Sequence, residues 1–137
     1  MIEHSERKAI YTDYAPEPSG IYSQALKVGQ TVYLAGQIGL LPQTGEMAGD
    51  DVLTQMRQVF TNLEYVAKAC GATLQDCAKF TVYLLDLNHF PLLNEVMQEY
   101  YLSPPFPART TIEVSRLPKG ALVEVDAIIV LNTKLAI

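Results

Sequence analysis

One long amphipathic segment constrains the fold of this chain more than any other feature. Between Val52 and Cys70, apolar side chains recur every three or four residues, which is the spacing of one buried helix face. Asp50 or Asp51 can cap the start of this helix, and Gly71 stands where a left-handed residue often ends one. The predicted buried stripe is Val52, Leu53, Met56, Val59, Phe60, Leu63, Val66, Ala67 and Cys70.

Most of the other elements are expected to be strands. Runs rich in β-branched and aromatic residues predict strands at 8–12, 22–28, 31–38 and 78–87, and two more follow residue 106. A second helix is expected from about 89 to 101, with Asn88 as its N-cap and Pro91 tolerated in its first turn. Its predicted apolar stripe is Phe90, Leu93, Val96, Met97 and Tyr100. This order and the length of 137 residues predict one α+β domain over residues 1–137.

Strand alternation leaves one face of the expected sheet without a helix. The covered face would hold Val32, Leu34, Ile38, Phe80, Val82, Leu84, Ile112 and Val114. The open face would hold Tyr33, Ala35, Gln37, Thr81, Tyr83, Leu85, Arg109, Thr111, Glu113, Glu124, Asp126 and Ile128. Because an aromatic, half-polar face of this kind is usually hidden against another subunit, we expect a homo-oligomer.

Composition excludes several classes of function. The formal net charge is −5, the sequence pI is about 4.9 and no Lys/Arg cluster is present, so nucleic-acid binding is not expected. No apolar run approaches the roughly 20 residues that span a bilayer, and the charged N-terminus lacks the apolar part of a secretory signal. The two cysteines, Cys70 and Cys77, fit a reducing compartment, so we expect a cytoplasmic protein.

The stretch from Phe106 to Asp126 is the strongest candidate for a functional site. It predicts two neighbouring strands joined by a Pro-Lys-Gly turn, with Arg109 on the first strand and Glu124 on the second. A guanidinium fork matches a carboxylate, and Glu124 and Asp126 share a face on which they could hold a water or move a proton. A structural salt bridge between Arg109 and Glu124, or a solvated acidic strand face, explains the same residues without a function.

The sequence lacks the residue patterns of several other kinds of functional site. His4 and His89 have no metal-ligand spacing with the cysteines, which are expected in the core. The sequence has no Ser-His-Asp pattern and no phosphate-binding glycine-rich loop. Elimination leaves a metal-free site for a small anionic molecule.

Several motifs along nearly the whole chain resemble those of the RidA (YjgF) family. They lie at residues 21–25, 33–38, 42–46, 85–90, 93–94, 107–109, 114–119 and 123–127. The resemblance implies a chorismate-mutase-like α+β fold, with a six-stranded mixed sheet and two helices on one face. It also implies a homotrimer with three clefts between subunits. The implied activity is the hydrolysis of reactive enamines and imines, such as 2-aminoacrylate and 2-iminopropanoate, to 2-oxo acids and ammonia without a cofactor.

The resemblance also assigns roles to particular residues. Arg109 would anchor the substrate carboxylate, and Glu124 would hold and activate the attacking water. Tyr22, Gly36, Asn94 and Thr111 would line the substrate cleft. Thr111 stands where many members have cysteine and Ala35 where many have serine; since backbone groups can do the same work there, we expect activity to survive.

Two other functions remain open at the level of sequence. The same cleft could sense 2-oxo acids without catalysis, in an oligomer that acts on a partner. The family resemblance also brings an endoribonuclease or translation-inhibiting activity, against which the acidic balance and the missing basic patch count.

Overall fold

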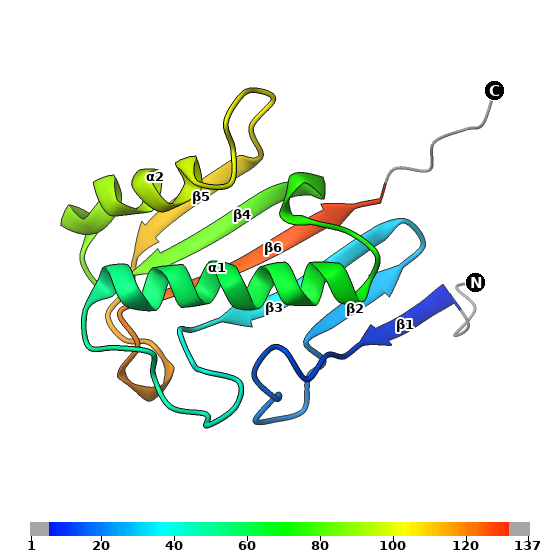
Figure 1. Cartoon of the computed structure of the whole chain (residues 1–137), viewed down its shortest axis with the longest axis horizontal. Helices are drawn as coiled ribbons and strands as arrows, with labels where there is room; N and C mark the ends of the chain where they lie inside the picture. The colour runs from blue at the N-terminus through cyan, green and yellow to red at the C-terminus, as the bar shows by residue number, and fades with distance from the viewer. Residues whose placement is uncertain (1–5, 132–137) are drawn as a thin grey trace.

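A computed structural model describes residues 6–131 of the chain (Figure 1). Residues 1–5, which include His4, and residues 132–137 lie outside the described part of the predicted domain. The elements are β1 (Arg7–Ile10), β2 (Ala25–Val28), β3 (Thr31–Gln37), α1 (Val52–Ala69), η2 (Leu74–Asp76), β4 (Cys77–Leu84), η3 (Leu87–His89), α2 (Phe90–Gln98), β5 (Ala108–Glu113), η4 (Pro118–Gly120) and β6 (Val123–Val130).

The strands form one six-stranded mixed sheet, as expected, and their order is β1-β2-β3-β6-β4-β5. Every neighbouring pair is antiparallel except β4 and β5, which are parallel. Parallel neighbours need a crossover, and α2 supplies it between β4 and β5. Helix α1 lies in front of the sheet in Figure 1 and packs on β6 and β3, while α2 contacts α1 and the β5 edge.

The core lies between the sheet and α1. Asp51 caps this helix by accepting from the Thr54 backbone N–H at 2.9 Å, and Gly71 follows it with a φ of +80°. The predicted stripe is buried except for Leu53 and Cys70, which are partly exposed. Phe60 contacts Phe80 of β4 edge to face, with ring centroids 5.5 Å apart. The firmest prediction from the sequence is therefore confirmed.

The start of the second helix differs from the prediction. Asp86, not Asn88, caps the chain here: its side chain accepts from the Asn88 N–H at 2.9 Å and begins the short turn η3. Helix α2 then begins at Phe90 with Pro91 in its first turn. Leu93 and Val96 are buried, whereas Phe90 is 38% exposed. Within residues 6–131, neither helix is both long and apolar enough to span a membrane.

The expected hairpin between the last two strands is wrong. Strand β4 lies between β5 and β6, so Arg109 and Glu124 are not on neighbouring strands. Arg109 pairs with Phe80 across the parallel β4–β5 ladder and therefore lies on the helix-covered face with it. Thr111 and Glu113 share that face, and Ile112 lies on the open face, the reverse of the expected assignment.

A bulge in β3 changes the faces of two further residues. The pairing of β3 with β6 shifts between Leu34 and Gln37. Since one extra residue reverses the alternation, Gln37 is buried and Ile38 lines a pocket, opposite to the expectation for both. The bulge contains Ala35 and Gly36, so it changes the backbone where the sequence predicts a site.

The packing of Phe80 gives a test of this core. Phe80 is fully buried between Phe60 and Tyr101, so Phe80→Ala should lower the free energy of unfolding by about 3–5 kcal/mol. The half-exposed Val130→Ala should cost less than about 1 kcal/mol. Denaturant titrations at one fixed protein concentration would measure both. Equal losses in the two variants would contradict this description of the core.

Candidate active site

The predicted site residues form two separate groups within one chain. Arg109 and Asn94 line a cavity of about 450 Å³ beside α2, and Thr111 lies two residues from Arg109 on the same face of β5. Tyr22, Gly36 and Glu124 line or border a second cavity of about 430 Å³. No residue is common to the two linings. Each cavity therefore holds only part of the predicted set.

Helix α2 holds the Arg109 side chain at the sheet edge. Its Nη1 donates to Asn94 Oδ1 at 2.8 Å and contacts Met97 Sδ at 3.4 Å. The guanidinium carbon lies 4.9 Å from the centre of the Phe90 ring. Burial lowers the pKa of Arg109 from its ordinary value, although a guanidinium remains charged at neutral pH. Among residues 6–131, no carboxylate lies within salt-bridge distance of it.

The surroundings of Arg109 therefore suit an anionic ligand. Asn94 and Met97 occupy one terminal nitrogen, and Phe90 stacks against the planar group. These contacts fix the orientation of the guanidinium without neutralising its charge. A half-buried guanidinium that has no carboxylate partner in the protein is stabilised when the carboxylate of a ligand binds it.

Thr111 provides a second polar group beside this arginine. It is two residues from Arg109 on the same strand face. Its Oγ1 is buried and has no hydrogen-bond partner among the residues described. Because a buried hydroxyl without a partner is unfavourable, this position suits a contact with a ligand or another chain.

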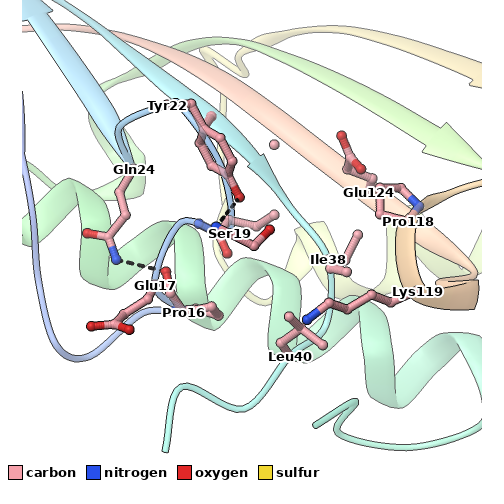
Figure 2. Close-up of a pocket in the computed structure, with 13 residues that line it drawn as sticks. Pro16, Glu17, Ser19, Tyr22, Gln24, Ile38, Leu40, Pro118, Lys119 and Glu124 are labelled. Atoms are coloured by element: carbon pink, nitrogen blue, oxygen red, sulfur yellow. Dashed lines mark hydrogen bonds between the residues drawn. The ribbon is translucent and has the colours of Figure 1, made fainter. Parts of the chain in front are cut away.

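The second cavity lies between the loop before β2, the bulge of β3 and the start of β6. Figure 2 shows Tyr22 and Glu124 on opposite sides of it, with the turn Pro118–Gly120 beside Glu124. The Tyr22 hydroxyl accepts from the Ser19 backbone N–H at 3.2 Å, which leaves its own proton free to donate. Lys119 lines the cleft in a left-handed conformation, with a φ of 56°. We call this cavity the Glu124 cleft.

Gly36 allows the Glu124 carboxylate to lie against the β3 backbone. A Cβ at residue 36 would lie 2.4 Å from Glu124 Oε2 and 3.0 Å from its Cδ. No side chain fits in that space unless the carboxylate moves. The Glu124 carboxylate thus occupies space at the bulge that the side chain of any residue other than glycine would fill.

Glu124 is surrounded by groups that favour its protonated form. Burial is the larger cause that raises its pKa, and the negative charge of Asp126 on the same face is the second. Tyr83, the cross-strand partner of Glu124, donates its hydroxyl to Asp126 Oδ2 at 3.0 Å. A carboxyl group with a raised pKa is suited to accept a proton and return it near neutral pH.

The sequence did not reveal all of these contacts. Phe90 was expected in the core, yet its ring stacks on Arg109. Tyr83 was expected on the open face but was given no role. The alternation of β4 indicates that face, and the pairing of β4 with β6 then places Tyr83 beside Glu124. Gln24 lies in a segment that resembles the family motif, but nothing in its residue type indicated that its side chain lies in the wall of the Glu124 cleft.

Comparisons with known proteins agree with this fold. A sequence profile of the family described as Endoribonuclease L-PSP matches residues 12–131. A 2-iminobutanoate/2-iminopropanoate deaminase from Dermatophagoides farinae is 45% identical over 128 residues, which cover 93% of this chain and 99% of that protein.

Solved structures give the same result. The crystal structure of RidA from an Antarctic Psychrobacter is 44% identical with a TM-score of 0.86, and the match covers 90% of this chain and 99% of that one. Escherichia coli TdcF, crystallised with bound serine, is 37% identical with a TM-score of 0.86, covering 91% and 99%.

The contact between Gly36 and Glu124 gives a direct test of the cleft. Gly36→Ala should displace the carboxylate and lower kcat/KM for imine hydrolysis by about 10- to 100-fold, because small misplacements of a reacting group are costly. The stability loss should be near the lower end of about 1–3 kcal/mol, since the displaced group ends a flexible side chain.

Gly20→Ala is the matched control for this variant. A Cβ at residue 20 would meet Tyr22 at an ordinary 3.5 Å, so its kcat/KM should stay within about twofold of the wild type. Full activity in Gly36→Ala would show that the place of Glu124 against Gly36 has no role in the reaction.

Proposed function

Because the chain belongs to the Endoribonuclease L-PSP family, which includes RidA, we propose that its two half-sites together hydrolyse small 2-imino acids. Relatives from Dermatophagoides farinae and Bos taurus, 45% and 41% identical over most of the chain, are 2-iminobutanoate/2-iminopropanoate deaminases. The protein is accordingly an imine deaminase. The structural observation that best supports this reaction is the half-buried Arg109, which has no carboxylate partner within residues 6–131.

Arg109 anchors the substrate in this proposal. The guanidinium forms paired hydrogen bonds with the substrate carboxylate, and Asn94 and Phe90 hold it in one orientation. Thr111 Oγ1 lies beside it and gains a partner when the substrate binds. These contacts fix the position of the imine carbon relative to a water molecule, which removes part of the entropic barrier.

Glu124 handles the protons of the reaction. Its carboxylate takes a proton from a water whose oxygen adds to the imine carbon, and the C=N double bond becomes a C–N single bond. Glu124 gives this proton to the nitrogen, which completes an amino group on the carbon that now carries the hydroxyl. It then moves the hydroxyl proton to the amino group, the C–N bond breaks, and ammonia leaves as the C=O double bond forms. The products are a 2-oxo acid and ammonia, and no electrons are transferred to another molecule. The raised pKa of Glu124 suits both halves of this cycle.

The two half-sites require a second copy of the chain. Strand β4 separates β5 from β6, so these strands are about 10 Å apart, and Arg109 and Glu124 lie on opposite faces. One small imino acid cannot reach both within one subunit. A homotrimer with sites at its subunit interfaces brings Arg109 of one subunit to Glu124 of the next. Exposed Leu102 and Phe106 next to the Arg109 cavity support such a contact.

A cytoplasmic location fits this chemistry. Cys70 and Cys77 are both free thiols, and burial raises the pKa of each. Protonated, partly or fully buried thiols suit a reducing compartment.

An endoribonuclease activity is the second candidate, because the family description and two solved relatives carry that name. The Glu124 cleft argues against it, since Glu17 and Glu124 line it together with the single cation Lys119. RNA cleavage that co-purifies with the oligomer and disappears in Glu124→Gln would favour this candidate.

A coupled assay tests the deaminase directly. A serine dehydratase generates 2-aminoacrylate, and the release of pyruvate is followed with and without the protein. We expect acceleration by the wild type and a loss of about 100-fold or more in Arg109→Ala, because the carboxylate loses its charged partner. Arg109→Lys keeps the charge but not the planar fork, so it should fall between the two.

Two outcomes of this assay would contradict parts of the proposal. No acceleration by the wild type, together with binding of 2-oxo acids, would favour the non-catalytic sensor. Full activity in a folded Arg109→Ala would show that Arg109 is structural. Circular dichroism and oligomer size of each variant control for misfolding.

The pair Glu124 and Asp126 predicts a change in pH dependence. Glu124 must be ionised to accept a proton, so kcat/KM should fall on the acid side as pH drops through its pKa. Asp126 raises that pKa, so Asp126→Asn should move the acid limb to lower pH. The asparagine oxygen can still accept from Tyr83, which keeps the local packing. An acid limb that stays in place, or moves upward, would contradict the role of Asp126.

A further inference from the structure

Gln24 is a buried amide that none of the predicted roles includes. Its side chain is 2% exposed, and it lies just before β2. Its Oε1 accepts from the Thr12 N–H at 2.7 Å. Its Nε2 donates toward the carbonyl oxygens of Thr12 at 3.0 Å, Ala15 at 3.3 Å and Pro16 at 2.9 Å. One side chain thus binds the backbone of the loop that follows β1 at four points.

That loop forms one wall of the Glu124 cleft. Pro16, Glu17, Ser19 and Tyr22 all line the cavity, and the dashed bond from Gln24 to Pro16 is visible in Figure 2. The loop contains little regular structure of its own between β1 and β2. Among the described residues, the hydrogen bonds of Tyr22 run from the Ser19 N–H to its hydroxyl and from its own N–H to the Gly20 carbonyl. The stacking of Tyr14 on Tyr65 and the buried Ala15 also hold this loop, and the Gln24 amide holds its backbone between Thr12 and Pro16.

The backbone of Gln24 connects this wall to the opposite one. Its carbonyl accepts from the Ala35 N–H at 2.9 Å, within the bulge of β3. The next residue is Gly36, against which the Glu124 carboxylate lies. The side chain of Gln24 thus binds the loop that carries Tyr22, and its main chain binds β3, against which the Glu124 carboxylate lies.

We propose that Gln24 is a positioning residue for the deaminase site, which holds the Tyr22 wall at a fixed distance from Glu124. It acts through the loop that carries Tyr22, whose backbone its side chain holds, and through the β3 bulge, whose backbone its main chain holds. This role rests on the proposed function, because it concerns the geometry of the same cleft.

The chemistry of an amide explains why glutamine suits this position. The loop presents one N–H donor and three carbonyl acceptors, and only a group with both an oxygen acceptor and N–H donors satisfies them together. A glutamate would place a carboxylate against three carbonyl oxygens. A methionine would fill the volume and leave all four backbone groups without this partner.

Two variants and one control test the proposal. Gln24→Met and Gln24→Glu should raise KM and lower kcat/KM for 2-aminoacrylate by about 10-fold or more, because the wall that carries Tyr22 shifts. Gln55→Met is the control, since Gln55 is 3% exposed and likewise binds backbone, at Gly49 O and Leu122 N. It should lose comparable stability and keep its kcat/KM within about twofold.

Hydrogen exchange gives a readout that does not depend on catalysis. Amides of residues 12–22 should exchange faster in both Gln24 variants, whereas those of α1 and β6 keep their protection. In Gln55→Met the amides of residues 12–22 should exchange as in the wild type. This result would hold even if the wild type failed to hydrolyse imines, so the two proposals fail separately.

Two results would overturn the role of Gln24. One is a folded Gln24→Met with wild-type kcat/KM and unchanged exchange at residues 12–22. The other is an equal loss of activity in Gln24→Met and Gln55→Met at equal loss of stability, which would make Gln24 an ordinary core residue.

Discussion

The position of β4 between β5 and β6 is the constraint on which the account of the site depends. It follows from the antiparallel pairing of β6 with both β3 and β4, and from the crossover through α2 that makes β5 parallel to β4. Arg109 is thereby placed on the helix-covered face and Glu124 on the open face. Within residues 6–131, the Arg109 guanidinium has no carboxylate partner and the Glu124 carboxyl group has a raised pKa. Because this separation prevents a salt bridge between Arg109 and Glu124 within one subunit, we propose that the two groups bind a ligand shared between subunits.

Each half-site depends on neutral groups that set positions without cancelling charge. Asn94 and Phe90 orient Arg109, while Gly36 leaves room for Glu124. Buried amides hold the walls of the Glu124 cleft. Besides Gln24, Asn62 of α1 is fully buried and donates to the carbonyls of Ile38 and Leu40, which line the cavity. The side-chain amide of Asn62 gives hydrogen-bond partners to backbone carbonyls that have left the regular sheet. Helix α1 therefore positions the cleft as well as covering the core.

The sequence predicted the elements and the family better than the arrangement of the site. The helix over residues 52–69 follows from its periodicity, and the mixed sheet from the alternation of strands and helices. The chain order could not reveal that β5 pairs with β4, because Pro118 to Gly120 resembles a hairpin turn. Alternation also predicted the wrong faces for Gln37 and Ile38. The bulge at Ala35 and Gly36 adds one residue to β3, which reverses the alternation after it. Arg109 and Glu124 were identified by residue type and by resemblance, whereas their separation depends on strand order.

Mixing two inactive variants tests the shared site most directly. Arg109→Ala lacks the proposed anchor and Glu124→Gln lacks the proposed base, so we expect each to be inactive alone in the coupled assay. The two variants are mixed in equal amounts, unfolded together and reassembled. With random association, about a quarter of the subunit interfaces then contain both an intact Arg109 and an intact Glu124. The account predicts about that fraction of wild-type activity. If the reassembled oligomers stay as inactive as the separate variants, Arg109 and Glu124 do not act together across a subunit interface.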